Sequence, residues 1–266
     1  MSARAAWLAL WAVLCLVPAP AGQVAGTSAA AAARLELERG DELRAAARGV
    51  RGRERLELRA RAVQVYASLR RRFPLARDEA ALGAFRAGEL LRSDGRAQAA
   101  GEEFEAARRL ARPGELQARA GLELGHLARR AGLHAEALAH YADVAAGART
   151  APRERDLARL WSGRSQAALG RHREARATLE ALAQGARDAT LRVSAFDERA
   201  LSWIVEGDLE AAAGELARCR RELRARALEQ GPQGERVRSA LRRMRAVGRL
   251  RAAVAERLEG VEIDSR

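Results

Sequence analysis

Apolar positions along this chain recur at helical spacing, and the whole pattern repeats four times. Each copy has a glycine between two amphipathic stretches, and the steps between these glycines are 37, 38 and 37 residues. An alanine follows each glycine by five residues, and a large apolar residue follows that alanine by four. The glycines are Gly95, Gly132, Gly170 and Gly207, the alanines are Ala100, Ala137, Ala175 and Ala212, and the large residues are Phe104, Tyr141, Leu179 and Leu216. The pattern predicts four pairs of antiparallel helices joined by glycine turns.

Small residues also recur in the first helix of each predicted pair. Gly88, Gly125 and Gly163 stand seven residues before their turn glycines, and Ala200 takes that place in the fourth copy. Small side chains let two helix backbones approach closely, with the large residue of the second helix filling the space beside them. Each pair leaves an apolar side that only a neighbouring pair can bury, so the pattern predicts an all-α solenoid of stacked pairs.

The string from "GELLRSDGRAQAAGEEF" onward resembles the tetratricopeptide repeat (TPR) family, which implies a right-handed superhelical solenoid. The step exceeds the usual repeat length of about 34 residues, which predicts longer loops between units. The repeat domain is expected to span residues 54–228. Its start, residues 54–74, fits the second helix of an earlier unit, with Ala62, Tyr66, Leu69 and Pro74 at the expected offsets. The first helix of that unit is not evident, because Gly49 and Gly52 interrupt the pattern, so residues 23–53 are assigned as an N-terminal linker and helical segment. The string "YASLRRRFPLARDEAALGAFRAGELL" is similar to bacterial envelope members of the family, such as the Tol-Pal coordinating periplasmic proteins and BamD-like lipoproteins.

The two ends of the chain differ from the repeats. Residues 1–22 have the pattern of a secretory signal peptide, with Arg4, an apolar run over 5–17, and small residues at Ala19 and Ala21. The expected location is therefore extracytoplasmic, periplasmic or secreted, with an uncleaved N-terminal anchor as the alternative. Residues 229–235 are predicted to form a linker, and residues 236–266 a basic capping helix and tail, helical over about 236–258.

Arginine dominates the charge of the chain. All 48 basic residues are arginine, no lysine or asparagine occurs, and the formal net charge is +13. Two interpretations stay open, namely the codon bias of a GC-rich genome and selection for an anionic partner.

Candidate chemistry is sparse. His126, His134 and His140 cluster in the sequence, but the repeat register places them on different faces, so no metal site is predicted. Neither a catalytic motif nor a phosphate-cradling glycine loop occurs, which predicts a non-catalytic protein without a cofactor. Cys219 is expected to be a small buried hydrophobe.

The resemblance implies a concave groove lined by the first helix of each pair. It places ten residues there as tentative partner-binding positions: Phe85, Glu89, Arg92, Arg119, Leu122, His126, Arg129, Arg130, Leu160 and Arg164. Asp197, Leu201 and Ile204 would line the groove in the fourth unit. Such a groove suits a protein or peptide, in particular a segment bearing carboxylates, because arginine binds them with paired hydrogen bonds. The carboxylate clamp of some family members uses lysine and asparagine, so that specificity is not implied.

The alternative function is an electrostatic adaptor. Residues 218–257 contain thirteen arginines and four glutamates, so this segment could bind an anionic membrane or cell-envelope polymer. Export argues against a nucleic acid partner.

Overall fold

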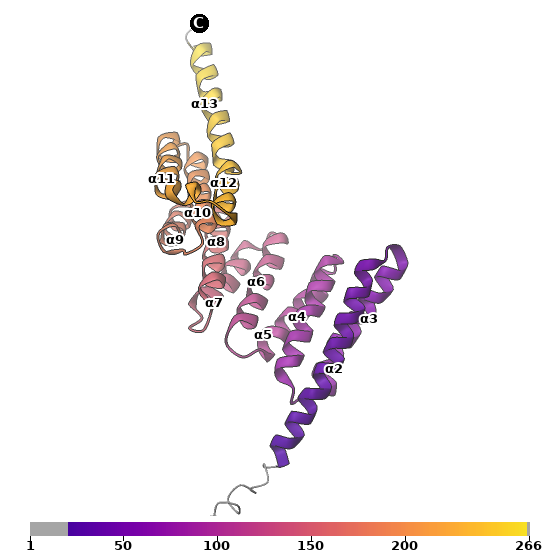
Figure 1. Cartoon of the computed structure of the whole chain (residues 1–266). Helices are drawn as coiled ribbons and strands as arrows, with labels where there is room; N and C mark the ends of the chain where they lie inside the picture. Colours follow the sequence, from indigo (N-terminus) through magenta and orange to yellow (C-terminus); the bar gives the residue numbers. More distant parts are fainter. Residues whose placement is uncertain (1–20, 265–266) are drawn as a thin grey trace, which may run out of the picture. The chain divides into compact units, whose positions relative to one another are not determined.

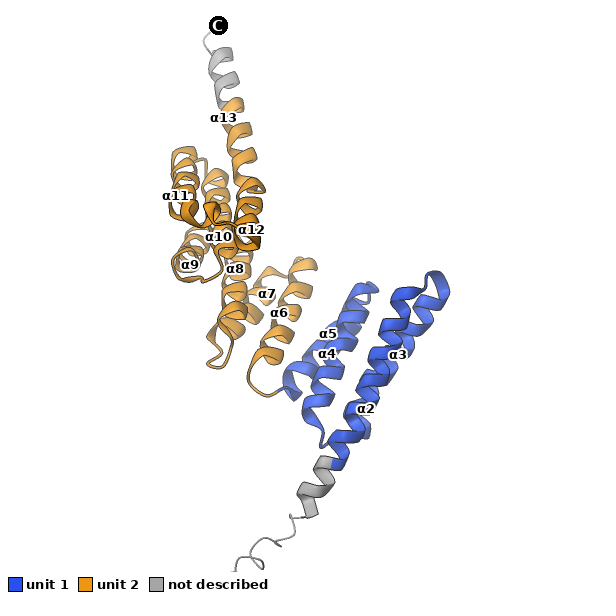
Figure 2. Cartoon of the chain, viewed as in Figure 1, with its two compact units in different colours: residues 1–111 blue, residues 112–266 orange. Residues whose placement is uncertain are grey.

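The computed structural model describes residues 21–264, and the side chains of residues 28–256. The chain divides into two compact units, residues 1–111 and 112–266 (Figure 2), and each is described by itself. All regular elements of the described residues are helices. Most of the predicted signal peptide, residues 1–22, lies outside the described residues. No helix in residues 21–264 has the length and apolar character needed to cross a bilayer.

Unit 1 contains two antiparallel helix pairs, which confirms the predicted architecture. The helices are α2 (Ala21–Gly49), α3 (Gly52–Arg72), α4 (Arg77–Ser93) and α5 (Ala97–Leu110) (Figure 1). Helices α2 and α3 form one pair and α4 and α5 the other, while α3 and α2 both contact α4. Tyr66, Leu69 and Ala62 are buried in its core. The stacking therefore follows chain order, as in a solenoid.

Helix α2 differs from the sequence-based expectation of a linker with an incomplete helix. It is a continuous helix whose Gly40 faces the ring of Tyr66, and an added Cβ at Gly40 would lie 2.4 Å from Tyr66 Cε1. Gly49 and Gly52 do not interrupt the unit. They mark the turn between its two helices, and Gly52 adopts a positive φ of 62°. The glycine-to-aromatic spacing is longer here than in the later pairs, which concealed the first helix from a search at fixed spacing.

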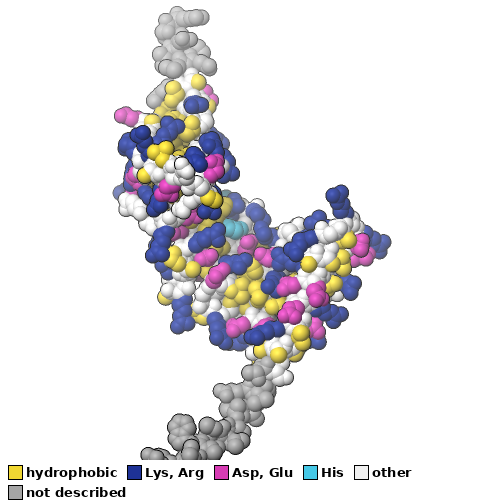
Figure 3. Space-filling view, in the orientation of Figure 1, with side chains coloured by type: hydrophobic (Ala, Val, Ile, Leu, Met, Phe, Trp, Pro, Cys, Tyr) yellow, Lys and Arg dark blue, Asp and Glu magenta, His cyan; other side chains and the backbone are white. Residues whose placement is uncertain are grey.

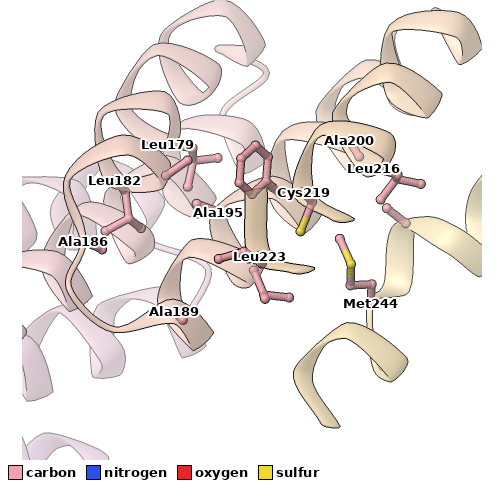
Figure 4. Close-up of a cluster of buried hydrophobic side chains, with 14 of the residues drawn as sticks. Leu179, Leu182, Ala186, Ala189, Ala195, Ala200, Leu216, Cys219, Leu223 and Met244 are labelled. Carbon is pink, nitrogen blue, oxygen red and sulfur yellow. The ribbon is translucent and has the colours of Figure 1, made fainter. Parts of the chain in front are cut away.

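Unit 2 continues the same arrangement. Its helices are α6 (Glu115–Arg130), α7 (His134–Ala146), α8 (Pro152–Ala168), α9 (His172–Gly185), α10 (Ala189–Val205), α11 (Leu209–Leu228), α12 (Pro232–Arg242) and α13 (Arg245–Asp264). Consecutive helices pack as antiparallel pairs, and α8 also contacts both α6 and α10. Figure 4 shows the larger core cluster, in which Leu179, Leu182, Leu216 and Leu223 surround the buried thiol of Cys219. Burial raises the pKa of Cys219 to about 12, so the thiol stays protonated at neutral pH.

The four turn glycines adopt the conformation that the repeat predicts. Gly95, Gly132, Gly170 and Gly207 have φ between 73° and 82°. The residue after each glycine donates its backbone N–H to a carbonyl five residues earlier, for example Leu133 to Ala128 at 2.9 Å. This bond closes the end of the first helix in a Schellman motif, which requires a left-handed residue.

The predicted close approach of the paired helices is confirmed in three pairs. An added Cβ at Gly88 would lie 2.7 Å from Phe104 Cε1, and one at Gly125 would lie 2.4 Å from Tyr141 Cε1. At Gly163 the distance to Leu179 Cγ would be 2.6 Å. The alanines of the second helices, Ala100, Ala137, Ala175 and Ala212, are fully buried. The helix spacing in each of these pairs is therefore set by a glycine against a large side chain.

The C-terminal segment forms two helices where the sequence predicted one. Helix α12 begins at Pro232, which shortens the predicted linker of 229–235, because proline is well tolerated in the first helical turn. The helical path breaks at Arg243, and Met244 and Ala246 are buried against α10 and α11. The break turns apolar residues of both short helices toward the core. Helices α12 and α13 thus cover the last repeat pair.

Candidate functional site

The sequence-predicted partner residues fall in both units and have unequal exposure. Phe85, Glu89 and Arg92 belong to unit 1 and the other seven to unit 2. Phe85, Leu122 and Leu160 are only 3%, 6% and 4% exposed, so these three contribute to the helix core and offer little surface to a partner. Phe85 contacts the ring of Phe104, with centroids 5.5 Å apart. The assignment of these three apolar residues to a binding groove is therefore wrong.

The predicted groove positions of the fourth repeat pair are also covered. Asp197 is buried, and its Oδ1 accepts the backbone N–H of Ala246 at 2.8 Å. Leu201 and Ile204 pack against the same core as α12 and α13. Helix α13 occupies this face of α10, so the candidate binding face of unit 2 is limited to α6 and α8.

On α6 and α8, two arginines and a histidine surround one indole. The Cζ atom of Arg129 lies 4.6 Å from the ring centroid of Trp161, and that of Arg164 lies 4.3 Å from it. The ring of His126 meets the indole edge-on, with centroids 4.9 Å apart. We call His126, Arg129, Trp161 and Arg164 the Trp161 platform. Trp161 itself is partly buried against the α6–α8 core.

A hydrogen bond holds the histidine of the platform in place. His126 Nδ1 lies 2.7 Å from the hydroxyl of Tyr141, a fully buried residue of α7. Burial raises the pKa of Tyr141 to about 12, and the positive charge of Arg129 opposes that increase. Because Tyr141 also packs on Gly125, the repeat core fixes the ring that orients His126.

The two arginines of the platform have different partners. Arg164 Nε pairs with Glu198 at 2.6 Å, and Glu198 also pairs with Arg245 at the start of α13. Arg129 forms no ion pair within the described residues, and its buried Nε has no hydrogen-bond partner. A guanidinium over an indole gains cation–π energy while its N–H edge stays available to an acceptor. The platform can therefore bind carboxylates, chiefly through Arg129.

The remaining predicted residues lie outside the platform. Arg119 is exposed and lies 3.8 Å from Glu115 on its own helix, and Arg130 is exposed at the end of α6. In unit 1, Glu89 pairs with Arg44 at 3.1 Å. Arginines and acidic side chains are interspersed over the visible face of both units (Figure 3). Within the described residues, no three His, Cys, Asp or Glu side chains are grouped so as to hold a metal ion.

Sequence reasoning missed Trp161 but selected its neighbour Leu160. One residue rotates a side chain by about 100° around a helix, so an error of one position exchanges a surface residue for a core residue. The missed signal was the spacing of three residues between Trp161 and Arg164. This spacing places both side chains on one face of a helix.

Together, the paired helices, glycine turns and stacked cores define an all-helical protein with a TPR-like repeat fold. No protein-family model matches the chain, and no curated protein sequence matches it. The crystal structure of nearly identical TPR-like repeats from a putative kinesin light chain of Podosopora anserina is similar, with a TM-score of 0.52 and 18% identity. That match covers 77% of this chain and 97% of the other. A variant of the same repeats also gives 0.52 and 18%, covering 74% and 93%. YrrB, a TPR protein with an unusual peptide-binding site, gives 0.48 at 19% identity, covering 62% and 78%.

Proposed function

We propose that this chain is a non-catalytic scaffold that binds an acidic segment of a partner protein at the Trp161 platform. The TPR-like fold supports protein or peptide partners in general. The observation that carries the finer proposal is the pair of guanidinium groups on the Trp161 ring, one of which, Arg129, has no ion pair within the described residues.

The chemistry of the platform favours an acidic segment with apolar residues. Tryptophan and arginine are the side chains that contribute most often to binding energy at protein interfaces. The indole offers an apolar contact, and the guanidinium groups offer paired N–H donors to carboxylates. A carboxylate near Arg129 would also satisfy the donor that is now buried without a partner.

The test is a peptide titration followed by tryptophan fluorescence. The probe is a synthetic peptide of glutamate and leucine, and its control replaces each glutamate by glutamine. We expect the acidic peptide to bind, and the Arg129→Gln variant to weaken binding roughly tenfold, since a hydrogen bond to a charged group contributes about 1.5–3 kcal/mol. Equal binding of both peptides would contradict a role for carboxylate recognition.

A matched control tests whether the platform or overall charge is responsible. Arg176 stacks on Trp203 with its Cζ 3.5 Å from the ring centroid and pairs with Glu206, as Arg164 stacks on Trp161 and pairs with Glu198. The Arg164→Gln variant should therefore weaken peptide binding, and Arg176→Gln should leave it unchanged. If both variants lose affinity equally, the binding is nonspecific attraction to a basic protein.

Export is a second part of the proposal. It is supported by the sequence of residues 1–22, with a short basic start, an apolar run and a small-residue end. A reporter enzyme that is active only outside the cytoplasm, fused after residue 30, tests it. An inactive reporter would overturn the extracytoplasmic assignment and leave the platform proposal intact.

The C-terminal segment is proposed to be a cap rather than a membrane-binding tail. Val237, Met244 and Ala246, which come from α12, α13 and the break between them, are buried in the core of the last repeat pair. Apolar side chains that are already covered by the protein are not available to a membrane surface, which favours the capping role over the alternative of an electrostatic adaptor.

A further inference from the structure

Unit 1 contains a pocket whose lining is mostly arginine. The pocket has a volume of about 270 Å³ and lies among the end of α2, the start of α3 and the end of α4. Its lining residues are Arg44, Ala47, Arg48, Arg55, Arg59, Glu89, Leu90, Arg92 and Ser93. Five guanidinium groups thus face one small space that contains a single carboxylate.

Two of these arginines are held by the protein itself. Arg44 pairs with Glu89 at 3.1 Å. Arg59 pairs with Asp94 at 2.7 Å and donates to the backbone carbonyl of Leu90 at 3.0 Å. Its side chain is only 11% exposed, and its Nε is buried without a hydrogen-bond partner. A buried donor of this kind costs free energy unless an acceptor enters the site.

Arg48 and Arg55 add charge that the described protein does not neutralise. Both are exposed, and neither forms a hydrogen bond or an ion pair within the described residues. Arg55 also lies in the first turn of α3, which begins at Gly52. The positive end of the helix dipole disfavours a cation there and favours an anion. Even with Glu89 and Asp94 counted, the five arginines leave an excess of positive charge.

We propose that this pocket, which we call the α2–α4 pocket, binds a compact oxyanion that carries about two negative charges, the chemistry of a phosphate monoester. Such a group has three strong acceptor oxygens and a charge of about −1.5 to −2 at neutral pH. Planar guanidinium groups bind it through paired hydrogen bonds. A single carboxylate would balance only part of the excess charge and has fewer acceptors. The site is independent of the Trp161 platform, which lies in the other unit.

The same phosphate chemistry could come from a free small molecule or from a lipid headgroup, and the experiment separates these sources. The full-length chain is titrated with inorganic phosphate by calorimetry in a chloride buffer, with acetate as the monoanion control. In parallel, it is mixed with phosphatidylcholine vesicles with and without phosphatidic acid, and bound protein is measured by flotation.

The variants use arginines whose loss should not disturb the fold. The test variant is Arg48→Gln with Arg55→Gln. The matched control is Arg39→Gln with Arg71→Gln, two exposed arginines of unit 1 that also form no ion pair within the described residues. Both double variants lower the net charge by the same amount, so any difference between them reports the pocket.

The expected result is saturable binding of phosphate but not acetate, weakened at least tenfold in the Arg48/Arg55 variant and unchanged in the control. Vesicle binding that requires phosphatidic acid and the same two arginines would assign the source to a lipid. Vesicle binding equal in both double variants, with free phosphate still bound through Arg48 and Arg55, would assign it to a small molecule. Absence of phosphate binding in both assays would overturn the proposal, as would equal losses in the two double variants.

Discussion

The packing of Gly125 against Tyr141 gives a sharp test of the repeat architecture, through the substitution Gly125→Ala. The added Cβ would lie 2.4, 2.7 and 2.8 Å from three atoms of the Tyr141 ring. Real Cβ contacts do not approach this closely, so the ring or the helix must move. The ring is fully buried, and its hydroxyl lies 2.7 Å from His126 Nδ1, so movement also strains that hydrogen bond.

The expected cost follows from opposing terms. Alanine favours a helix over glycine by about 1 kcal/mol. Overpacking a core costs about 1–3 kcal/mol, and loss of a hydrogen bond costs about 1 kcal/mol. The free energy of unfolding should therefore fall by about 1–3 kcal/mol in the Gly125→Ala variant.

Gly214→Ala is the matched control. Gly214 lies within α11, is exposed, and has nothing within 4 Å of an added Cβ. Here only the helix preference acts, so the variant should gain up to about 1 kcal/mol. Urea unfolding followed by tryptophan fluorescence, to which Trp161 and Trp203 of unit 2 contribute, measures both variants. A Gly125→Ala midpoint equal to or above that of the wild type would refute the argument that glycine sets the helix spacing.

Three further predictions concern buried groups. The chain has two tyrosines, Tyr66 and Tyr141, and burial raises the pKa of both, that of Tyr141 to about 12. The folded protein should thus show little tyrosinate absorbance near pH 10, and its stability should decrease as the pH rises above about 10, because the unfolded state then releases protons that the folded state retains; a normal tyrosine titration in a protein whose circular dichroism is unchanged would contradict this. Cys219 should react with a thiol reagent only after unfolding, so rapid labelling of the native chain would show that its burial is wrong. Asp197→Ala should remove the acceptor at the start of α13, speed amide exchange there, and lower the free energy of unfolding by about 1–2 kcal/mol, whereas the change Glu210→Ala at an exposed position should have little effect.

The sequence was sufficient to predict the helix pairs, because the constraints that form them are local and recur at fixed spacing. A turn that needs a positive φ requires glycine, and this requirement marks Gly132 and its equivalents. A close helix contact requires a small residue opposite a large one, which marks Gly125 and Tyr141. The α2–α3 pair escaped detection because Gly40 and Tyr66 face each other in the same way at a different spacing.

The candidate sites depended on contacts that no local pattern contains. The rotation of α8 decides that Trp161 is partly exposed while Leu160 enters the core. The break at Arg243 decides that α13 covers Asp197, which the repeat pattern alone would leave in a groove. The α2–α4 pocket likewise combines residues from three helices. Sequence spacing thus determined which helices pair, because pairing depends on side-chain size along neighbouring segments. Only the tertiary structure decided which charged and aromatic groups meet, because that depends on how each helix is rotated and which distant segment covers it.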